Sequence, residues 1–192
     1  ADGMRYVWHR EDLKTVLAML FLVATFGLNF PIFISTMAVS VFRVDANAYG
    51  LLSSMLAVGS LIGALLSARR AGPRMPLLIG GAAMFGVGCA VAAMMPSYVF
   101  FAAALVVIGI ASQTFMVGAN STVQIGSDPA LRGRVMAIYL AISLGSTPLG
   151  APIVGWVADT FGPRWALAVA AAAGLAAAFV GRRYVMRFRP TA

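Results

Sequence analysis

The sequence predicts an all-α membrane protein with six transmembrane helices, arranged as two inverted repeats of three helices. Apolar residues make up 61% of the 192 positions and charged residues only 10%, and the mean hydropathy is +0.91. A soluble domain is about 45–50% apolar and about one quarter charged, so this composition excludes one. The apolar positions number about 117, enough for roughly six helices of about 20 residues each. A transmembrane β-barrel would show short alternating segments in place of these long apolar runs.

Charged residues mark the ends of the six spans. The first uncharged stretch lies between Lys14 and Arg43, and the long stretch between Arg74 and Asp128 accommodates two helices divided at Pro96. The charges that bound the other spans are Asp45 and Arg69, Arg134 and Asp159, and Arg164 and Arg182. A helix rises about 1.5 Å per residue, so about 20 residues cross the hydrocarbon core of a bilayer. We expect helices at residues 14–41, 48–69, 75–95, 97–125, 134–158 and 164–185.

The expected organisation is an interfacial segment at residues 1–13, a transmembrane bundle at 14–187 and a tail at 188–192. Six spans place both termini on one side of the membrane, together with the loops near Arg69 and Arg132. Twelve of the 14 basic residues fall on that side, whereas only Arg43 and Arg164 fall on the other. Cytoplasmic loops carry the excess of Lys and Arg, so we expect both termini in the cytoplasm.

The charged and reactive residues argue against several other classes of protein. The net charge of +8 does not indicate nucleic-acid binding, because the basic residues lie between apolar runs and form no patch on a soluble face. The only histidine, His9, precedes the first span, so a Ser-His catalytic site is not available. His9 and the single cysteine, Cys89, are too far apart in sequence to suggest a metal site. We therefore expect no enzymatic activity, no metal and no cofactor.

A short motif recurs within the chain. Gly72-Pro73-Arg74 and Gly162-Pro163-Arg164 lie 90 residues apart, each between the second and third helix of a triplet. The helices that follow both motifs are rich in Ala and Gly and apolar all round. Two copies of a three-helix unit must cross the membrane in opposite directions, and inverted repeats of this kind are typical of secondary transporters. The alternative is that Ala-rich helices resemble each other by chance.

The other four helices carry polar residues on one face, which identifies candidates for a cavity formed by the first, second, fourth and fifth helices. Gln113 and Asn120 share a face of the fourth helix because two turns take about 7.2 residues. Asn29 lies just before Pro31, where we expect a kink in the first helix. Polar side chains either form hydrogen bonds between helices or line a water-filled cavity, and buried amides cost more to leave unpaired than the serine hydroxyls do. The substrate-cavity candidates are Asn29, Gln113, Asn120, Gln124, Tyr139 and Ser143.

Glycine and proline single out two helices for close contact or bending. Gly59 and Gly63 form a G-x-x-x-G motif on the second helix, which lets two helix backbones approach closely. On the fifth helix, residues 145–155 contain three glycines and two prolines, Pro148 and Pro152. This density predicts a bent, closely packed or deformable helix.

Several motifs resemble those of the major facilitator superfamily of transporters. The segment from Gly155 to Arg164 resembles the family's G-x-x-x-D-x-x-G-x-R signature, and Pro152-Ile-Val-Gly155 is similar to the core of its antiporter motif. Asn120-Ser-Thr-Val-Gln124, with the loop that follows it to Arg134, resembles the branch that contains the bacterial enterobactin exporter. Arg69 departs from the signature, which has an aspartate there, so we expect the arginines near it to determine topology only. The resemblance implies a conformational or gating role for Arg132, Arg134, Pro148, Pro152, Gly155, Asp159, Gly162 and Arg164.

The resemblance covers nearly the whole chain, as helices seven to twelve of a twelve-helix fold. It implies a secondary active transporter of the inner (plasma) membrane that exports a small amphiphilic molecule, such as a drug or siderophore, by alternating access. The implied partners are the substrate, the lipid bilayer, a missing N-terminal six-helix half and protons as coupling ion. All six acidic residues lie in loops or near helix ends, so a proton-coupling carboxylate is expected in the missing half. The alternative function is a non-transporting membrane scaffold or partner-binding helical bundle.

Overall fold

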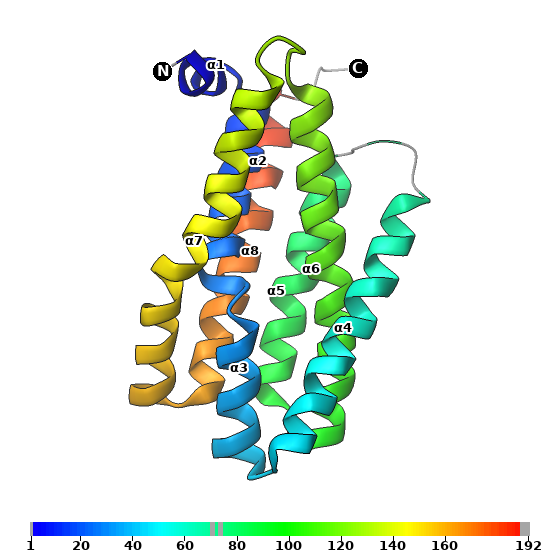
Figure 1. Ribbon diagram of the computed structural model, residues 1–192, viewed down its shortest axis with the longest axis vertical. Coiled ribbons are helices and arrows are strands. Elements are labelled where there is room, and N and C mark those ends of the chain that lie inside the picture. The colour runs from blue at the N-terminus through cyan, green and yellow to red at the C-terminus, as the bar shows by residue number, and fades with distance from the viewer. Residues whose placement is uncertain (1, 70–71, 73–74, 189–192) are drawn as a thin grey trace.

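The computed structural model describes residues 2–69, 72 and 75–188, and this part of the chain folds into one bundle of helices without strands (Figure 1). Six helical segments are long and apolar enough to cross a membrane, as the sequence predicts. The elements, in order, are α1 (Asp2–His9), α2 (Glu11–Leu22), η1 (Val23–Gly27), α3 (Phe30–Thr36), η2 (Met37–Phe42), α4 (Ala46–Ala68), α5 (Met75–Met94), α6 (Tyr98–Gly126), α7 (Arg132–Phe161) and α8 (Pro163–Phe188).

The first span is a composite of α2, η1, α3 and η2 that runs from Glu11 to Phe42. Its π-helical turn η1 ends with a hydrogen bond from the Leu28 amide to the Val23 carbonyl, and α3 starts after Asn29 with Pro31 in its first turn. The Asn29 side-chain amide donates to the Thr25 carbonyl at 2.8 Å. Proline lacks the amide that would continue the helix, so the predicted break occurs at this site.

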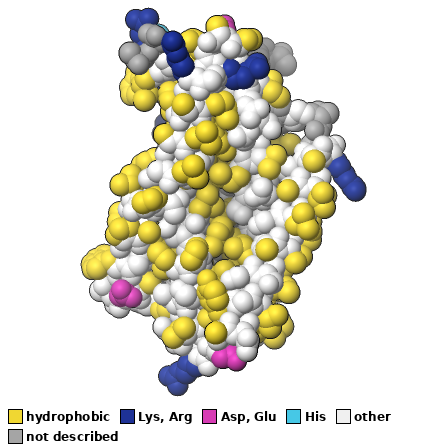
Figure 2. All heavy atoms as spheres, viewed as in Figure 1, with side chains coloured by type: hydrophobic (Ala, Val, Ile, Leu, Met, Phe, Trp, Pro, Cys, Tyr) yellow, Lys and Arg dark blue, Asp and Glu magenta, His cyan; other side chains and the backbone are white. Residues whose placement is uncertain are grey.

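α1 lies across the end of the bundle at which both termini are found (Figure 1). The sequence predicts an interfacial segment here, and the structure makes it a separate short helix that contacts α2 and α7. Charged side chains lie at the ends of the helices, and the surface between them is largely apolar (Figure 2). We call the end that carries α1, Arg132 and the end of α8 the basic end of the bundle.

The helices pair in a pattern that has the symmetry of the predicted repeat. α4 packs along α6, α5 packs along α8, and the first span contacts α7 mainly through η1. As spans, these are the pairs two–four, three–six and one–five. In an inverted repeat, span one corresponds to span four, two to five and three to six. This correspondence converts the pair two–four into five–one and leaves the pair three–six unchanged. This is the relation that two inverted three-helix units require.

Glycines allow the backbones to touch at these pairings. A Cβ atom on Gly59 would overlap the Val106 carbonyl oxygen of α6, and one on Gly150 would overlap the Thr25 carbonyl oxygen of the first span. Gly59 and Gly150 occupy matching places in the two repeats, about 90 residues apart. The third pairing brings Gly174 onto Gly86, where an added Cβ would lie 2.8 Å from the glycine Cα. The predicted close approach at the G-x-x-x-G motif is confirmed.

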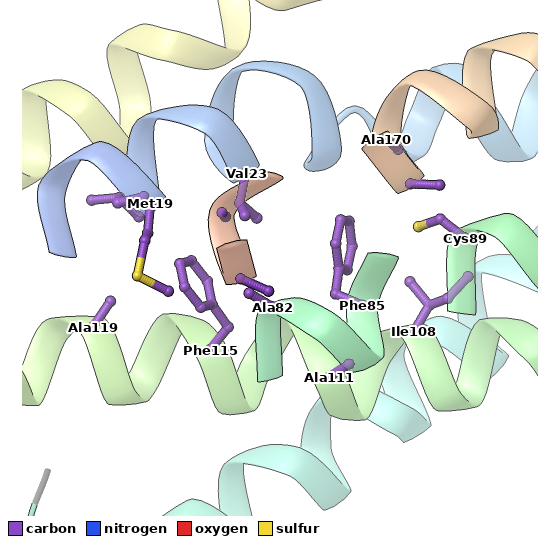
Figure 3. Close-up of a cluster of buried hydrophobic side chains, with 14 of the residues drawn as sticks. Met19, Val23, Ala82, Phe85, Cys89, Ile108, Ala111, Phe115, Ala119 and Ala170 are labelled. Atoms are coloured by element: carbon purple, nitrogen blue, oxygen red, sulfur yellow. The ribbon is translucent and has the colours of Figure 1, made fainter. Parts of the chain in front are cut away.

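The core lies between the first span, α5, α6 and α8 (Figure 3). Phe85 and Phe115 are fully buried there, with Met19 and Val23 of the first span packed beside them (Figure 3). Gly27 and Gly174 lie against the Phe85 ring and Gly81 lies against Phe115, which lets the helices pack closely around the two rings. α5 and α8 therefore contribute to the core of the bundle, whereas α4 and α7 are its least buried spans.

A methyl group added at Gly150 tests the contact between α7 and the first span. We expect Gly150→Ala to destabilise the protein by about 1–3 kcal/mol, because the new Cβ has to displace the backbone of Thr25. Gly145→Ala on the same helix is the matched control, since no atom lies within 4 Å of its added Cβ. Melting temperatures in detergent compare the stabilities of the two variants with that of the unmodified protein. Equal melting temperatures for the two variants would contradict the close contact.

Single cysteines test the predicted orientation of the bundle in a Cys89→Ala background. We expect cysteines at Asn47 and Thr160, both exposed near loops at the end opposite the basic end, to react with an impermeant thiol reagent added to intact cells. A cysteine at the exposed Ala130 should react only after the membrane is opened. Ala130 is preferred to Ser127 in the same loop, which is buried. Labelling of Ala130 in sealed cells, with Asn47 unlabelled, would reverse the orientation.

Candidate functional site

A shallow groove between α6 and α7 contains three of the six predicted cavity residues. Its volume of about 260 Å³ is below the roughly 300–1,000 Å³ of complete ligand pockets, and it is open on one side. It runs from the middle of α6 toward the basic end. A groove of this size and shape can form one wall of a larger site. Its lining residues are Gln113, Met116, Val117, Asn120, Ser121 and Tyr139.

Contacts of α6 with α4 and with α7 position the residues of the groove. Gln113 lies beside Gly63 of α4, where a glycine Cβ would come within 3.2 Å of the Gln113 Cβ. On the other side, the buried Tyr139 of α7 donates its hydroxyl to the Met116 carbonyl at 3.4 Å. The groove therefore presents amide groups from α6 and a phenol group from α7 among apolar methionine and valine side chains.

Gln124 belongs to the edge of this site and not to its lining. Its side-chain amide donates to Asn120 Oδ1 at 2.7 Å, one helical turn away, and the residue is exposed toward the basic end. This hydrogen bond holds the side chain of Asn120 in one orientation. The two amides that resemble the family motif are thus coupled, and only Asn120 reaches the groove.

Two other candidates lie apart from the groove. Asn29 is only 2% exposed, and its amide bonds to the backbone at the break of the first span, so it faces the interior of the bundle. Ser143 lies one turn beyond Tyr139 on α7. Its Oγ and that of Ser67 are buried and lack a hydrogen-bond partner within the described residues. The structure thus brings Gln113, Asn120 and Tyr139 together, with Gln124 beside them, and leaves Asn29 and Ser143 outside.

The residues with a predicted gating role occupy both ends of α7 and its exposed face. Arg132 and Arg134 are exposed in its first turn, at the basic end, and Pro148 and Pro152 lie on its exposed face. α7 remains one helix through both prolines and bends partway along its length (Figure 1). No atom lies within 4 Å of a Cβ added to Gly155, so this glycine leaves a gap on the α7 surface.

At the opposite end, Gly162 terminates α7 with a φ of +100°, a left-handed conformation that favours glycine. Arg164 then donates to the Met95 carbonyl at 3.3 Å, which joins the start of α8 to the end of α5. Asp159 is exposed, and among the described residues it forms no ion pair. The acidic and basic members of the signature are therefore not paired with each other in this chain.

Sequence reasoning missed a cluster of hydrogen bonds around Arg10. The Arg10 guanidinium binds both carboxylate oxygens of Asp12, at 2.9 and 2.7 Å, and donates to the Tyr6 hydroxyl and the Gly126 carbonyl, both at 3.1 Å. The Tyr6 hydroxyl also accepts the Asp128 amide at 3.1 Å. These bonds attach α1 and the start of α2 to the end of α6. The i,i+4 spacing of Tyr6 and Arg10 suggests that these two side chains meet. It does not predict their bonds to Gly126 and Asp128.

The helical fold with six candidate spans agrees with comparisons to known proteins. The sequence model of the Major Facilitator Superfamily matches residues 15–192, so the chain belongs to this family of transporters and is a multi-pass membrane protein. Among characterised relatives, the chain is similar to "Multidrug efflux pump Tap" of Mycolicibacterium fortuitum, with 29% identity over 166 residues. That match covers 84% of this chain and 40% of the relative, so the chain spans less than half of that protein's length. The predicted family is confirmed.

Replacement of Arg10 tests whether its hydrogen bonds stabilise the basic end. Lysine keeps the charge but loses the planar, bidentate donor set, so we expect Arg10→Lys to destabilise the protein by about 1–2 kcal/mol, a value reduced by the partial exposure of the pair. Arg5→Lys makes the same chemical change at an exposed position of α1 and should stay within about 0.5 kcal/mol. Thermal unfolding in detergent compares the two. A loss of equal size in both variants would show that the Arg10 contacts contribute nothing specific.

Proposed function

We propose that this chain forms the C-terminal half of an exporter of small amphiphilic molecules, in which the α6–α7 groove is one wall of the substrate cavity. The observation that carries the proposal is the groove itself, which combines the amides of Gln113 and Asn120 with an apolar lining and is open on one side. Amphiphilic ligands suit a site that is mostly apolar with a few oriented polar groups. The similarity to a protein named as a multidrug efflux pump supports export as the direction.

A second bundle would complete this cavity. α4 and α7 are the least buried spans, and α7 is one of the two helices that form the groove. A wall supplied by six further helices would enclose the groove and cover these two spans. In such a pair of bundles, rocking of one half against the other exposes a central site alternately to the two sides of the membrane. The bend of α7 and its unpacked Gly155 would let this helix adjust during the rocking.

Coupling to protons would require residues outside this chain. Intramembrane carboxylates are costly and therefore mark proton relays where they occur. The six acidic residues here are all in loops or near helix ends, so within this chain substrate binding would rest on uncharged hydrogen-bonding groups. We further propose that the bundle lies in the inner (plasma) membrane with both termini in the cytoplasm, on the strength of the uneven distribution of arginines.

Alanine variants in the complete transporter test the site. We expect Gln113→Ala and Asn120→Ala to weaken the apparent affinity for substrate by about two- to ten-fold, the value of one hydrogen bond, with little change in melting temperature. Asn29→Ala should do the opposite, because its amide bonds to the break inside the bundle: a lower melting temperature with transport per folded molecule unchanged. Accumulation of a fluorescent amphiphilic dye in inverted vesicles, together with thermal unfolding, measures both quantities.

Asn47→Ala is the matched control, since Asn47 is exposed in the first turn of α4 and remote from the groove. Unchanged affinity in both groove variants, with lowered stability, would make Gln113 and Asn120 packing residues and remove them from the site. Absence of substrate-dependent accumulation by the unmodified protein, across a panel of amphiphilic dyes, would favour the scaffold function instead.

A further inference from the structure

A second cavity lies between the first and last spans at the basic end of the bundle, away from the α6–α7 groove. α2 and α8 pack against each other, and between their ends lies an open cavity of about 560 Å³, within the range of ligand sites. The polar residues that line it are Glu11, Thr15, Arg183, Tyr184 and Arg187. Large apolar side chains of α8 beside the cavity are exposed, as they would be in contact with lipid. Nothing in the proposed transport cycle uses this cavity.

The cavity carries an excess of positive charge. Its one carboxylate, Glu11, already pairs with Lys14 at 2.6 Å, and the Thr15 hydroxyl donates to the Glu11 carbonyl at 2.7 Å. Within the described part of the chain, Arg183 and Arg187 form no ion pair and no hydrogen bond. Among residues 2–69, 72 and 75–188, two guanidinium groups at one site therefore lack an anionic partner.

Both guanidinium groups lie over aromatic rings. Arg183 lies over the ring of Phe179 and Arg187 over the ring of Phe188, each 5.7 Å from the ring centroid. Stacking against a ring leaves the edge N–H groups of a guanidinium free to bind an oxyanion, for which the planar donor set is well suited. The two arginines, four residues apart, lie on one face of α8.

Apolar side chains continue from this cavity along the lipid-facing surface of α8. Phe179 is 58% exposed and Met186 61% exposed, and Leu175 lies one further turn toward the membrane centre. A basic site at the membrane surface, joined to an exposed apolar stripe, matches a molecule with an anionic head and a hydrocarbon tail. Basic pockets between transmembrane helices bind lipid head groups in this way.

We propose that the α2–α8 cavity binds the phosphate of an anionic phospholipid, with Arg183 and Arg187 as its donors and the α8 surface beside Phe179 in contact with the acyl chains. A bound lipid would bridge the first and last spans of the bundle. The two arginines would also bind a free phosphate ester. The competition experiment below distinguishes such an ester from a lipid.

Native mass spectrometry tests the proposal on the full-length protein released from nanodiscs that contain equal amounts of phosphatidylglycerol and phosphatidylcholine. We expect retained lipid to be enriched in phosphatidylglycerol. Even without a specific site, one basic residue near an anionic membrane surface strengthens the binding of anionic lipid by a factor of roughly five. Arg182→Gln, one residue outside the cavity, should lower the enrichment by no more than about that factor, whereas Arg183→Gln should lower it further and the double variant with Arg187→Gln should abolish it.

Arg183→Lys provides a second variant that keeps the charge, and it should retain part of the enrichment because it loses only the planar donor set. Helix content measured by circular dichroism confirms that each variant is folded. Equal losses in Arg182→Gln and Arg183→Gln, or no enrichment in the unmodified protein, would overturn the site. Displacement of the lipid by glycerol 3-phosphate at low concentration, with no effect of Phe179→Ala on lipid retention, would assign the site to a soluble phosphate ester and overturn the lipid proposal.

Discussion

Close contact between helix backbones is the interaction on which the rest of this structure depends. In a bilayer, apolar side chains gain little by leaving lipid for one another, so helices associate through packing and interhelical hydrogen bonds. Gly59, Gly150 and the Gly86–Gly174 pair each let two backbones meet without an intervening side chain. The same kind of contact positions one residue of the α6–α7 groove, because Gly63 lets α4 lie directly beside Gln113 of α6. Small residues thus determine where the polar ones lie.

The bilayer also restricts where polar side chains and broken helices can lie. A helix can be interrupted inside a membrane only where protein satisfies the freed backbone groups. The break between η1 and α3 meets this condition because it is buried and Asn29 bonds to the Thr25 carbonyl. Gln113 and Asn120 lie in unbroken helix, where no backbone group needs their amides. Side-chain amides therefore have two roles in this bundle. Where the helix is broken, the amide bonds to the backbone, and where the helix is continuous, the amide is available to the groove.

The sequence predicts the fold better than the site, for physical reasons that particular residues illustrate. Helix length, the charges at helix ends and the motif at Gly72 and Gly162 are properties of consecutive residues, so the six spans and their repeat follow directly. Periodicity also places Gln113 and Asn120 on one face. It cannot say which helix faces which, so the sequence also offers Asn29 and Ser143 as cavity candidates, and the structure places both outside the groove. The bond from Arg10 to Gly126 could not be predicted, because the two residues lie more than one hundred positions apart.

The pairing of the helices also constrains the order in which the bundle can assemble. Spans enter a membrane one after another as the chain is made, yet the first span finds its glycine partner only in the fifth, and the third finds the matching glycine only in the sixth. The interrupted backbone around Leu28 therefore has to remain in the membrane without the cover of α7 until most of the chain has been synthesised. Its local bonds, from Leu28 to Val23 and from Asn29 to Thr25, are made entirely within the first span. These two bonds satisfy backbone groups at the break without any contribution from the helices that are made later.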